Sequence, residues 1–305
     1  MLTYILLIVG FVMLIKGADI FVENVSGIAK KFGIPSIIIG LTIVAMGTSA
    51  PELSVSIQSA IAGMNDISIA NVVGSNLFNL LVVLGLSACI GQLKINNYGD
   101  IIILLLSGLI FLLNIINGSL AMWEGVQLLV IFAFYLGHLI WKAINENEQT
   151  EEVEGTKHSL LMSILISILG LIAIIWGGDI VVDSASIIAE QLGMSQNLIG
   201  LTVVSIGTSL PELVTSLVAT KKGEMDIAVG NVIGSNIFNL LLIIGASAAI
   251  SPMNVSILAI YDALFMIITL MVFIAMTSKT EAVTKKQGII LVLIYLGYMI
   301  FTILR

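Results

Sequence analysis

Two glutamates lie where the chain is otherwise apolar, and each closes the same six-residue motif. The motif reads GTSAPE over residues 47–52 and GTSLPE over residues 207–212. An ionisable side chain inside a membrane segment costs a few kcal/mol and marks a functional site. Proline lacks an amide donor, so it should break the helix beside each glutamate and free backbone carbonyls for a cavity or a ligand. The residues that could perform chemistry are therefore the two buried carboxylates, Glu52 and Glu212.

Oxygen-bearing side chains accompany both glutamates. One helical turn before the glutamates come the hydroxyls of Thr48, Ser49, Thr208 and Ser209. On the following segments, pairs spaced four apart share one helix face: Ser75 with Asn79, and Ser235 with Asn239. With no Cys or His nearby, this all-oxygen set suits a hard cation such as Ca²⁺. Two carboxylates balance one Ca²⁺, two Na⁺ or two H⁺, and rival ions at one site are the simplest basis for antiport.

The two motifs belong to a duplicated half-chain. Gly207 repeats Gly47 at a distance of 207 − 47 = 160 residues, and the segment NVVGSNLFNL at 71–80 returns as NVIGSNIFNL at 231–240 with the same spacing. The acidic residues Asp19 and Asp179 also keep this distance; we interpret them as interfacial residues near helix ends. Such an internal repeat indicates two equivalent structural units.

Composition excludes a water-soluble globule. The chain has 305 residues, of which 58% are hydrophobic and only 10% charged, and its mean hydropathy is +1.14. Because a bilayer helix needs about 20 apolar residues, the chain holds about ten such segments. The sequence predicts an all-α polytopic membrane protein with spans near 2–28, 36–62, 67–91, 99–117, 122–144, 159–188, 196–220, 226–250, 254–276 and 287–304.

Charge divides the chain and orients it. A polar, acidic linker at 145–158 separates a first half, 1–144, from a second half, 159–305. Ten of the 12 basic residues fall in odd-numbered connections, which places those connections in the cytoplasm and both termini outside. Five spans per half then make the repeats inverted, an arrangement of secondary transporters whose site lies near the midplane. We expect a multi-pass protein of the cell membrane, and no basic patch for nucleic acid.

Four activities compete for the paired glutamates. The first is a sodium-driven calcium antiporter, and the second a calcium/proton antiporter in which the carboxylate pair titrates as a unit. A channel is the third, although broken helices in inverted repeats suit an occluding site better than a continuous pore. The fourth is an intramembrane hydrolase with two carboxylates as acid and base, for which the surrounding hydroxyls and amides are superfluous. The repeated Gly and Ser residues could also serve helix packing alone.

The paired motifs resemble the alpha repeats of the calcium/cation antiporter superfamily, in particular the compact prokaryotic sodium/calcium exchangers. The resemblance covers the whole chain in length, span count and repeat layout. It implies ten transmembrane helices in two inverted repeats of five, with the second, third, seventh and eighth spans forming the core. The first and sixth spans would be tilted helices that slide past this core. It also implies a transporter and not an enzyme, with no prosthetic group and no obligate protein partner.

Carried over by position, the resemblance implies a ligand set for the transported ions. Ca²⁺ would be bound by Glu52 and Glu212 with Thr48 and Thr208. The Na⁺ ligands would be Ser49, Ser209, Ser75 and Ser235, with the carbonyls of Ala45 and Ser205, and a central polar ring would be completed by Asn79 and Asn239. Some relatives have Asp where this chain has Asn239, which argues against potassium dependence. The Gly-Asn-x-x-Glu pattern of proton/calcium exchangers is not found at the glutamates, which favours sodium as the counter-ion.

Overall fold

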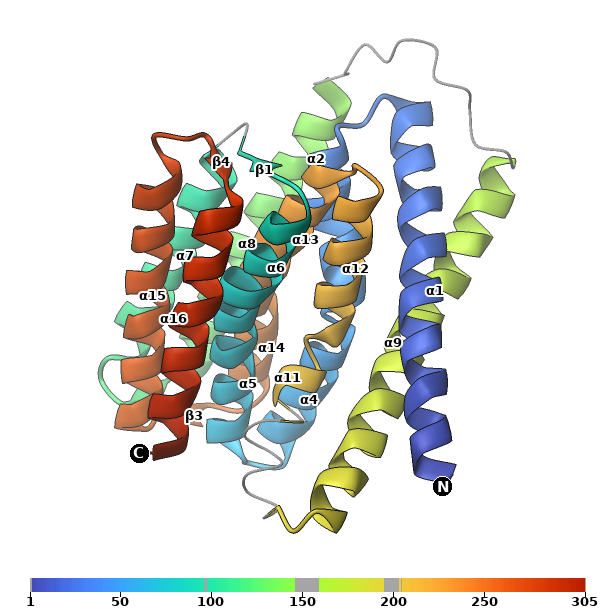
Figure 1. The fold of residues 1–305 in the computed structure, drawn as a ribbon. Helices are drawn as coiled ribbons and strands as arrows, with labels where there is room; N and C mark the ends of the chain where they lie inside the picture. The colour runs from blue at the N-terminus through green and yellow to red at the C-terminus, as the bar shows by residue number, and fades with distance from the viewer. Residues whose placement is uncertain (1, 96–97, 146–158, 195–202, 204, 305) are drawn as a thin grey trace.

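In the part of the chain that the structure describes, the molecule is a bundle of long helices with four very short strands. The computed structural model describes residues 2–95, 98–145, 159–194, 203 and 205–304 (Figure 1). The first half contains α1 (Leu2–Phe32), α2 (Ser36–Ile39), η1 (Gly40–Val44), α3 (Ala45–Thr48), α4 (Ala50–Ile61), α5 (Asn65–Phe78), η2 (Asn79–Val83), α6 (Leu84–Ile90), β1 (Leu93–Lys94), α7 (Gly99–Ile115), β2 (Ser119–Leu120) and α8 (Met122–Asn145). The second half contains α9 (Leu160–Gln191), α11 (Ser205–Gly207), α12 (Leu210–Lys221), α13 (Met225–Phe238), η4 (Asn239–Ile243), α14 (Ile244–Ile250), β3 (Met253–Asn254), α15 (Ile257–Thr277), β4 (Ala282–Val283) and α16 (Lys285–Leu304).

The predicted helical membrane protein is confirmed. Within the described ranges, seven helices are long and apolar enough to cross a bilayer, or eight if the bent pair Ser36–Thr48 and Ala50–Ile61 is one span. The helix α7 is apolar but shorter. The start of the span predicted at 196–220 lies outside the described residues, so the count of ten spans stays a prediction. The predicted linker also lies outside them, except for Asn145.

Two pairs of short strands are the exception to an all-α fold. The strand β1 pairs antiparallel with β4, with Leu93 opposite Val283, and β2 pairs antiparallel with β3, with Leu120 opposite Met253. The pair β1 and β4 lies at one end of the molecule and β3 at the other (Figure 1). Each pair joins a loop of the first half to a loop of the second. The pairing satisfies backbone groups in these loops, which require hydrogen-bond partners.

The helices that carry the motifs lie in the centre. In the most apolar stretch of Met225–Ile250, 94% of the residues are buried inside the protein, against 17% in α16. The helices α7, α8, α15 and α16 cover one side of these central segments, while α1 and α9 cross one another on the opposite side (Figure 1). The exposed apolar side chains of the outer helices are those expected to face lipid.

Glycines allow helix backbones to touch, for example where η1 meets α13 and where α1 meets α9. A Cβ at Gly40 would lie 2.8 Å from the carbonyl oxygen of Ile227 in α13. Between α1 and α9, a Cβ at Gly17 would lie 2.8 Å from the carbonyl oxygen of Gly170, and one at Gly177 2.9 Å from that of Gly10. Helix association in membranes depends on such close packing, because there is no hydrophobic driving force between helices.

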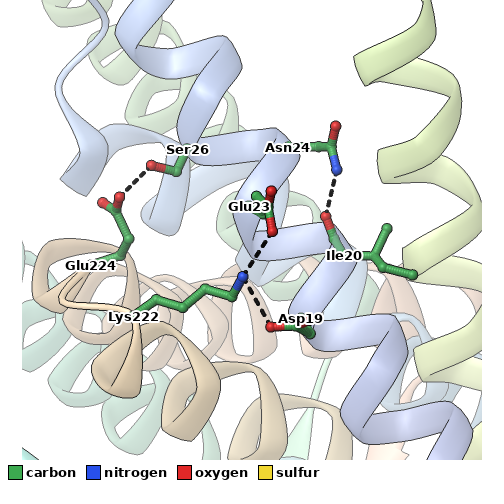
Figure 2. A network of polar contacts seen from close by, with 7 residues as sticks. All are labelled: Asp19, Ile20, Glu23, Asn24, Ser26, Lys222 and Glu224. Carbon is green, nitrogen blue, oxygen red and sulfur yellow. Dashed lines mark hydrogen bonds and ion pairs between the residues drawn. The ribbon is translucent and has the colours of Figure 1, made fainter. Parts of the chain in front are cut away.

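A network of charges docks α1 onto the connection between α12 and α13 (Figure 2). Lys222 lies 2.9 Å from Asp19 and 3.1 Å from Glu23, and Glu224 accepts hydrogen bonds from Lys30 and Ser26 at 2.6 Å. Partial burial lowers the pKa of Lys222, but the hydrogen bonds and charges of the two α1 carboxylates raise it above its ordinary value. These pairs are partly exposed to solvent, so each contributes about 1 kcal/mol or less.

The equivalent positions of the repeat cannot form this charge network. The residues 160 positions before Lys222 and Glu224 are Ala62 and Met64, which cannot form ion pairs. The acidic residues of α9 at the equivalent positions, Asp179 and Asp183, therefore have no matching lysine in the loop between α4 and α5. The two halves share a backbone plan and differ in the charges that dock their long first helices.

The glycine contact between α1 and α9 gives a first prediction. Replacing Gly17→Leu forces two backbones apart, and overpacking of this kind costs about 1–3 kcal/mol. We expect the midpoint of thermal unfolding in detergent to fall by about 2–5 °C. Gly137→Leu in α8 is the matched control, because no atom lies within 4 Å of a Cβ built there. Equal midpoints for the two variants would contradict the assigned contact.

Candidate cation-binding site

The helix of the first motif breaks just before its glutamate. Ser49 has a φ of −83° and a ψ of 10°, and the flanking helical segments meet at an angle of 49°. Pro51 follows at the start of α4, where its missing amide would otherwise pair with the carbonyl of Gly47. Ser209 has nearly the same backbone angles before Pro211 and α12. The break predicted from proline is confirmed.

Each glutamate lies in the first turn of the helix that follows the break. Glu52 is in α4 and Glu212 in α12, and both side chains are 0% exposed. The amino end of a helix carries a partial positive charge that favours a carboxylate. The broken backbone thus compensates part of the cost of burying two acids.

Serine hydroxyls of one motif reach the glutamate of the other. Ser49 donates to Oε1 of Glu212 at 2.9 Å, and Ser209 donates to Oε1 of Glu52 at 3.0 Å. Ser75 of α5 also lies 3.2 Å from Oε1 of Glu52, and 2.9 Å from the Ser209 hydroxyl. The two motifs therefore form one site, in which the hydroxyl groups cross between the halves.

Several oxygens at this site lack a protein partner. Among the residues that the structure describes, Oε2 of both Glu52 and Glu212 is buried without a hydrogen bond, as are the side-chain oxygens of Asn79 and Asn239. Within the described residues neither glutamate pairs with a lysine or arginine, and no cluster of three or more His, Cys, Asp or Glu side chains occurs. A cation held by the two carboxylates would take its remaining ligands from neutral oxygens.

Some of the other predicted site residues also contact this site. The hydroxyl of Ser235 lies 3.4 Å from the carbonyl oxygen of Ala45, and Asn239 donates to Ser75 at 3.2 Å. Thr48 and Thr208 lie beside asparagines of the opposite half, as described next. Ser205 is in α11, and its side chain is outside the described part of the chain.

Two asparagines that the sequence analysis left without a role brace the motifs. Asn231 of α13 donates to the carbonyl of Glu212 at 3.3 Å and to Ser216 at 2.9 Å, and its Oδ1 lies 3.0 Å from the hydroxyl of Thr48. Asn71 of α5 makes the equivalent bonds to Glu52 and Ser56, with Thr208 at 3.5 Å. The signal for this role was present, since both asparagines keep the 160-residue spacing in otherwise apolar helices.

Turns of π-helix begin at the central asparagines. The segment η2 starts at Asn79 and η4 at Asn239, and a third, η1, covers Gly40–Val44. Single π-helical turns inside longer helices are rare overall, but many of those that occur lie at functional sites. The extra residue rotates the side chains of the helix that follows. No residue type in these segments indicates a π-helical turn, so the sequence analysis predicted regular α-helix here.

Comparison with known proteins agrees with this geometry. The family model for the sodium/calcium exchanger protein matches residues 2–141 and 162–304. The sodium/calcium exchanger MaX1 of Methanosarcina acetivorans is 32% identical, with 97% of each chain covered, and the putative antiporter CaxA of Alkalimonas amylolytica is 35% identical, with 96% of each covered. A structure of the sodium-calcium exchanger NCX_Mj, soaked with Na⁺ and Sr²⁺, superposes with a TM-score of 0.87 at 30% identity over 98% of both chains.

The fold and the family together define the class of protein: a polytopic membrane transporter of the calcium/cation antiporter superfamily. Within that superfamily, the chain belongs to the sodium/calcium exchanger protein family. The resemblance read from the paired motifs is thereby confirmed.

The asparagine braces give a second prediction. Asn231→Leu leaves a buried threonine, a serine and a carbonyl without their partner, which costs about 1–3 kcal/mol. We expect a clear fall in the thermal unfolding midpoint measured by intrinsic fluorescence in detergent. Gln58→Leu in α4 is the control, because Gln58 is exposed and bonds only to Ser54 of its own helix. A fall no larger than that of the control would argue against the brace.

Proposed function

We propose that this protein is a secondary active antiporter that exchanges Na⁺ for Ca²⁺ across the membrane by alternating access. Competing ions share one site near the middle of the membrane, built around Glu52 and Glu212. Ca²⁺ and Na⁺ are its transported substrates.

One observation carries this proposal: two fully buried carboxylates each keep one oxygen without a partner. An unpaired buried charge is expensive, so the site is stable when a cation supplies the missing charge. The two acids together hold a charge of −2, which one Ca²⁺ neutralises. The surrounding ligands are hydroxyl and amide oxygens, which hard cations prefer over transition metals.

The shared hydroxyls give a physical basis for exclusion between ions. Ser209 lies within hydrogen-bond distance of both Glu52 and Ser75, so all three oxygens belong to one cluster. A sodium ion bound between these oxygens would draw on the carboxylate that Ca²⁺ needs. Two Na⁺ balance the same charge as one Ca²⁺, so each ion can replace the other without leaving a bare charge.

The relatives support the choice of ions. MaX1 is named a sodium/calcium exchanger, and the NCX_Mj structures were obtained with Na⁺ together with Ca²⁺ or Sr²⁺. The ligand set proposed for this chain is Glu52, Glu212, Thr48, Thr208, Ser49, Ser209, Ser75, Ser235, Asn79, Asn239 and the carbonyls of Ala45 and Ser205.

We extend the proposal to the architecture: ten spans in two inverted repeats, 1–144 and 159–305, joined by a cytoplasmic linker at 145–158. Support comes from the strand pairs, because β3 follows β1 by 160 residues and yet lies at the other end of the molecule (Figure 1). The start of α1 and the end of α16 lie at one end, opposite β1 with its Lys94. Lysines gather in cytoplasmic connections, so both termini would be outside the cell membrane.

Transport by the purified protein tests the function. Liposomes loaded with Na⁺ and diluted into sodium-free medium should take up labelled Ca²⁺. We expect Glu52→Gln and Glu212→Gln to lower this uptake by about two orders of magnitude, because removing one charge of a buried set costs a few kcal/mol of cation binding. Glu281→Gln is the control, because Glu281 is exposed in the loop before β4.

The same vesicles separate the proposal from its alternatives. Uptake driven only by an imposed proton gradient would replace sodium by H⁺ as the coupling ion. Uptake that ignores both gradients would indicate a channel. Normal sodium-driven uptake by both glutamine variants would remove the carboxylate pair from the mechanism.

Labelling from one side of the membrane tests the orientation. In a Cys89→Ser background, a membrane-impermeant maleimide should label Glu151→Cys only in inside-out vesicles and Leu2→Cys only in right-side-out vesicles. This result is expected because cytoplasmic loops collect the lysines. The reverse pattern would invert the proposed topology.

A further inference from the structure

The amide of Asn239 is held by two residues of the other half. Its Nδ2 donates to Oδ1 of Asn76 at 2.9 Å and to the hydroxyl of Ser75 at 3.2 Å, and all three side chains are buried. Both amide hydrogens are thus used, while Oδ1 of Asn239 has no partner. An asparagine held by its nitrogen keeps its oxygen fixed in direction and free to accept a cation.

The equivalent amide in the first half is not held. By the 160-residue spacing, Asn79 corresponds to Asn239, and Asn236 corresponds to Asn76. Yet neither amide atom of Asn79 has a partner among the described residues, and Oδ1 of Asn236 is also unpartnered. The duplicated sequence therefore produces two central asparagines that differ among the described residues: the amide of Asn239 is held by hydrogen bonds, and that of Asn79 has none.

Asn76 is itself fixed by a reciprocal pair of bonds between α5 and α13. Its Nδ2 donates to the carbonyl oxygen of Asn236, and Nδ2 of Asn236 donates to the carbonyl oxygen of Asn76, both at 3.2 Å. Behind this pair lies a cavity of about 10 Å³, lined otherwise by apolar side chains such as Leu104, Met266 and Leu270. These neighbours offer Asn76 no competing donor.

We propose that Asn76 is a positioning residue that orients the Asn239 carbonyl toward the transported cation, and that Asn236 has no such role toward Asn79. This inference rests on the proposed function, because it assumes that the central amides bind the ion. It makes the site asymmetric: Asn239 is a ligand set in place before the ion arrives, whereas Asn79 turns toward an ion only once it is bound.

Calcium binding by the purified full chain, measured by titration calorimetry, tests the asymmetry. Asn76→Leu removes the bond to Asn239 and the bond from Asn76 to the carbonyl of Asn236, while Asn236→Leu removes only the bond from Asn236 to the carbonyl of Asn76. Leucine suits both positions because the cavity beside them is apolar. We expect Asn76→Leu to raise the calcium Kd about fivefold, the ratio given by one hydrogen bond of ordinary strength, and Asn236→Leu to leave it nearly unchanged. Both should lower the thermal unfolding midpoint, and Asn76→Leu should lower it more because it removes one more hydrogen bond.

A double-mutant cycle distinguishes positioning from general loosening of the helices. If Asn76 acts through Asn239, then Asn76→Leu should add little to the loss caused by Asn239→Ala. The matched cycle, Asn236→Leu with Asn79→Ala, should be additive. Additivity in the first cycle, or equal effects of the two leucine variants on the calcium Kd, would overturn the proposal.

Two further arms keep the test independent of folding and of transport. If Asn76→Leu does not fold, the calcium Kd of Asn76→Ala is compared with that of its control, Asn236→Ala, in the same way. Because calorimetry needs no gradient, failure of sodium-driven uptake would refute the proposed exchange and leave the comparison of Asn76 with Asn236 standing. Conversely, sodium-driven calcium uptake together with equal effects of Asn76→Leu and Asn236→Leu on the calcium Kd would refute only the positioning role.

Discussion

Two carboxylates buried together inside a membrane protein are the constraint on which the rest of the structure depends. Glu52 and Glu212 are inaccessible to water, and an ionised acid in such surroundings is tolerated only when its charge is compensated. The fold supplies part of this compensation through the amino ends of α4 and α12 and through serine hydroxyls. It withholds the remainder, since one oxygen of each acid stays without a partner. This missing compensation is the basis for proposing that a cation binds here.

The compensation crosses between the halves of the chain, so neither half could form the site alone. Ser49 bonds to Glu212, Ser209 bonds to Glu52, and the threonines of each motif lie beside asparagines of the other half. Such exchange requires the broken segments to lie directly against the central helices. Gly40 permits this at α13, where any side chain would collide with the backbone. The small residues near the motifs therefore serve packing, and this close approach also brings the oxygens of the proposed site together.

Duplication has produced two halves that are similar in backbone and different in chemistry. The charge network around Lys222 docks α1 and has no counterpart at Ala62 and Met64. The amide of Asn239 is held and that of Asn79 is not. An antiporter with inverted repeats presents equivalent surfaces to the two sides of the membrane. If this chain has the proposed inverted repeats, differences of this kind would make the two orientations of its transport cycle unequal in energy.

The sequence by itself determined the helical membrane class, the 160-residue repeat, the helix breaks and the two glutamates. These features depend on apolar run length, on proline and on the cost of an acid in lipid, which are properties of the residues themselves. The tertiary structure decided which glutamate each serine serves, the bracing by Asn71 and Asn231, the π-helical turns and the asymmetry at Asn239. Those features depend on how the two halves meet, and residues far apart in the chain acquire partners only through that packing.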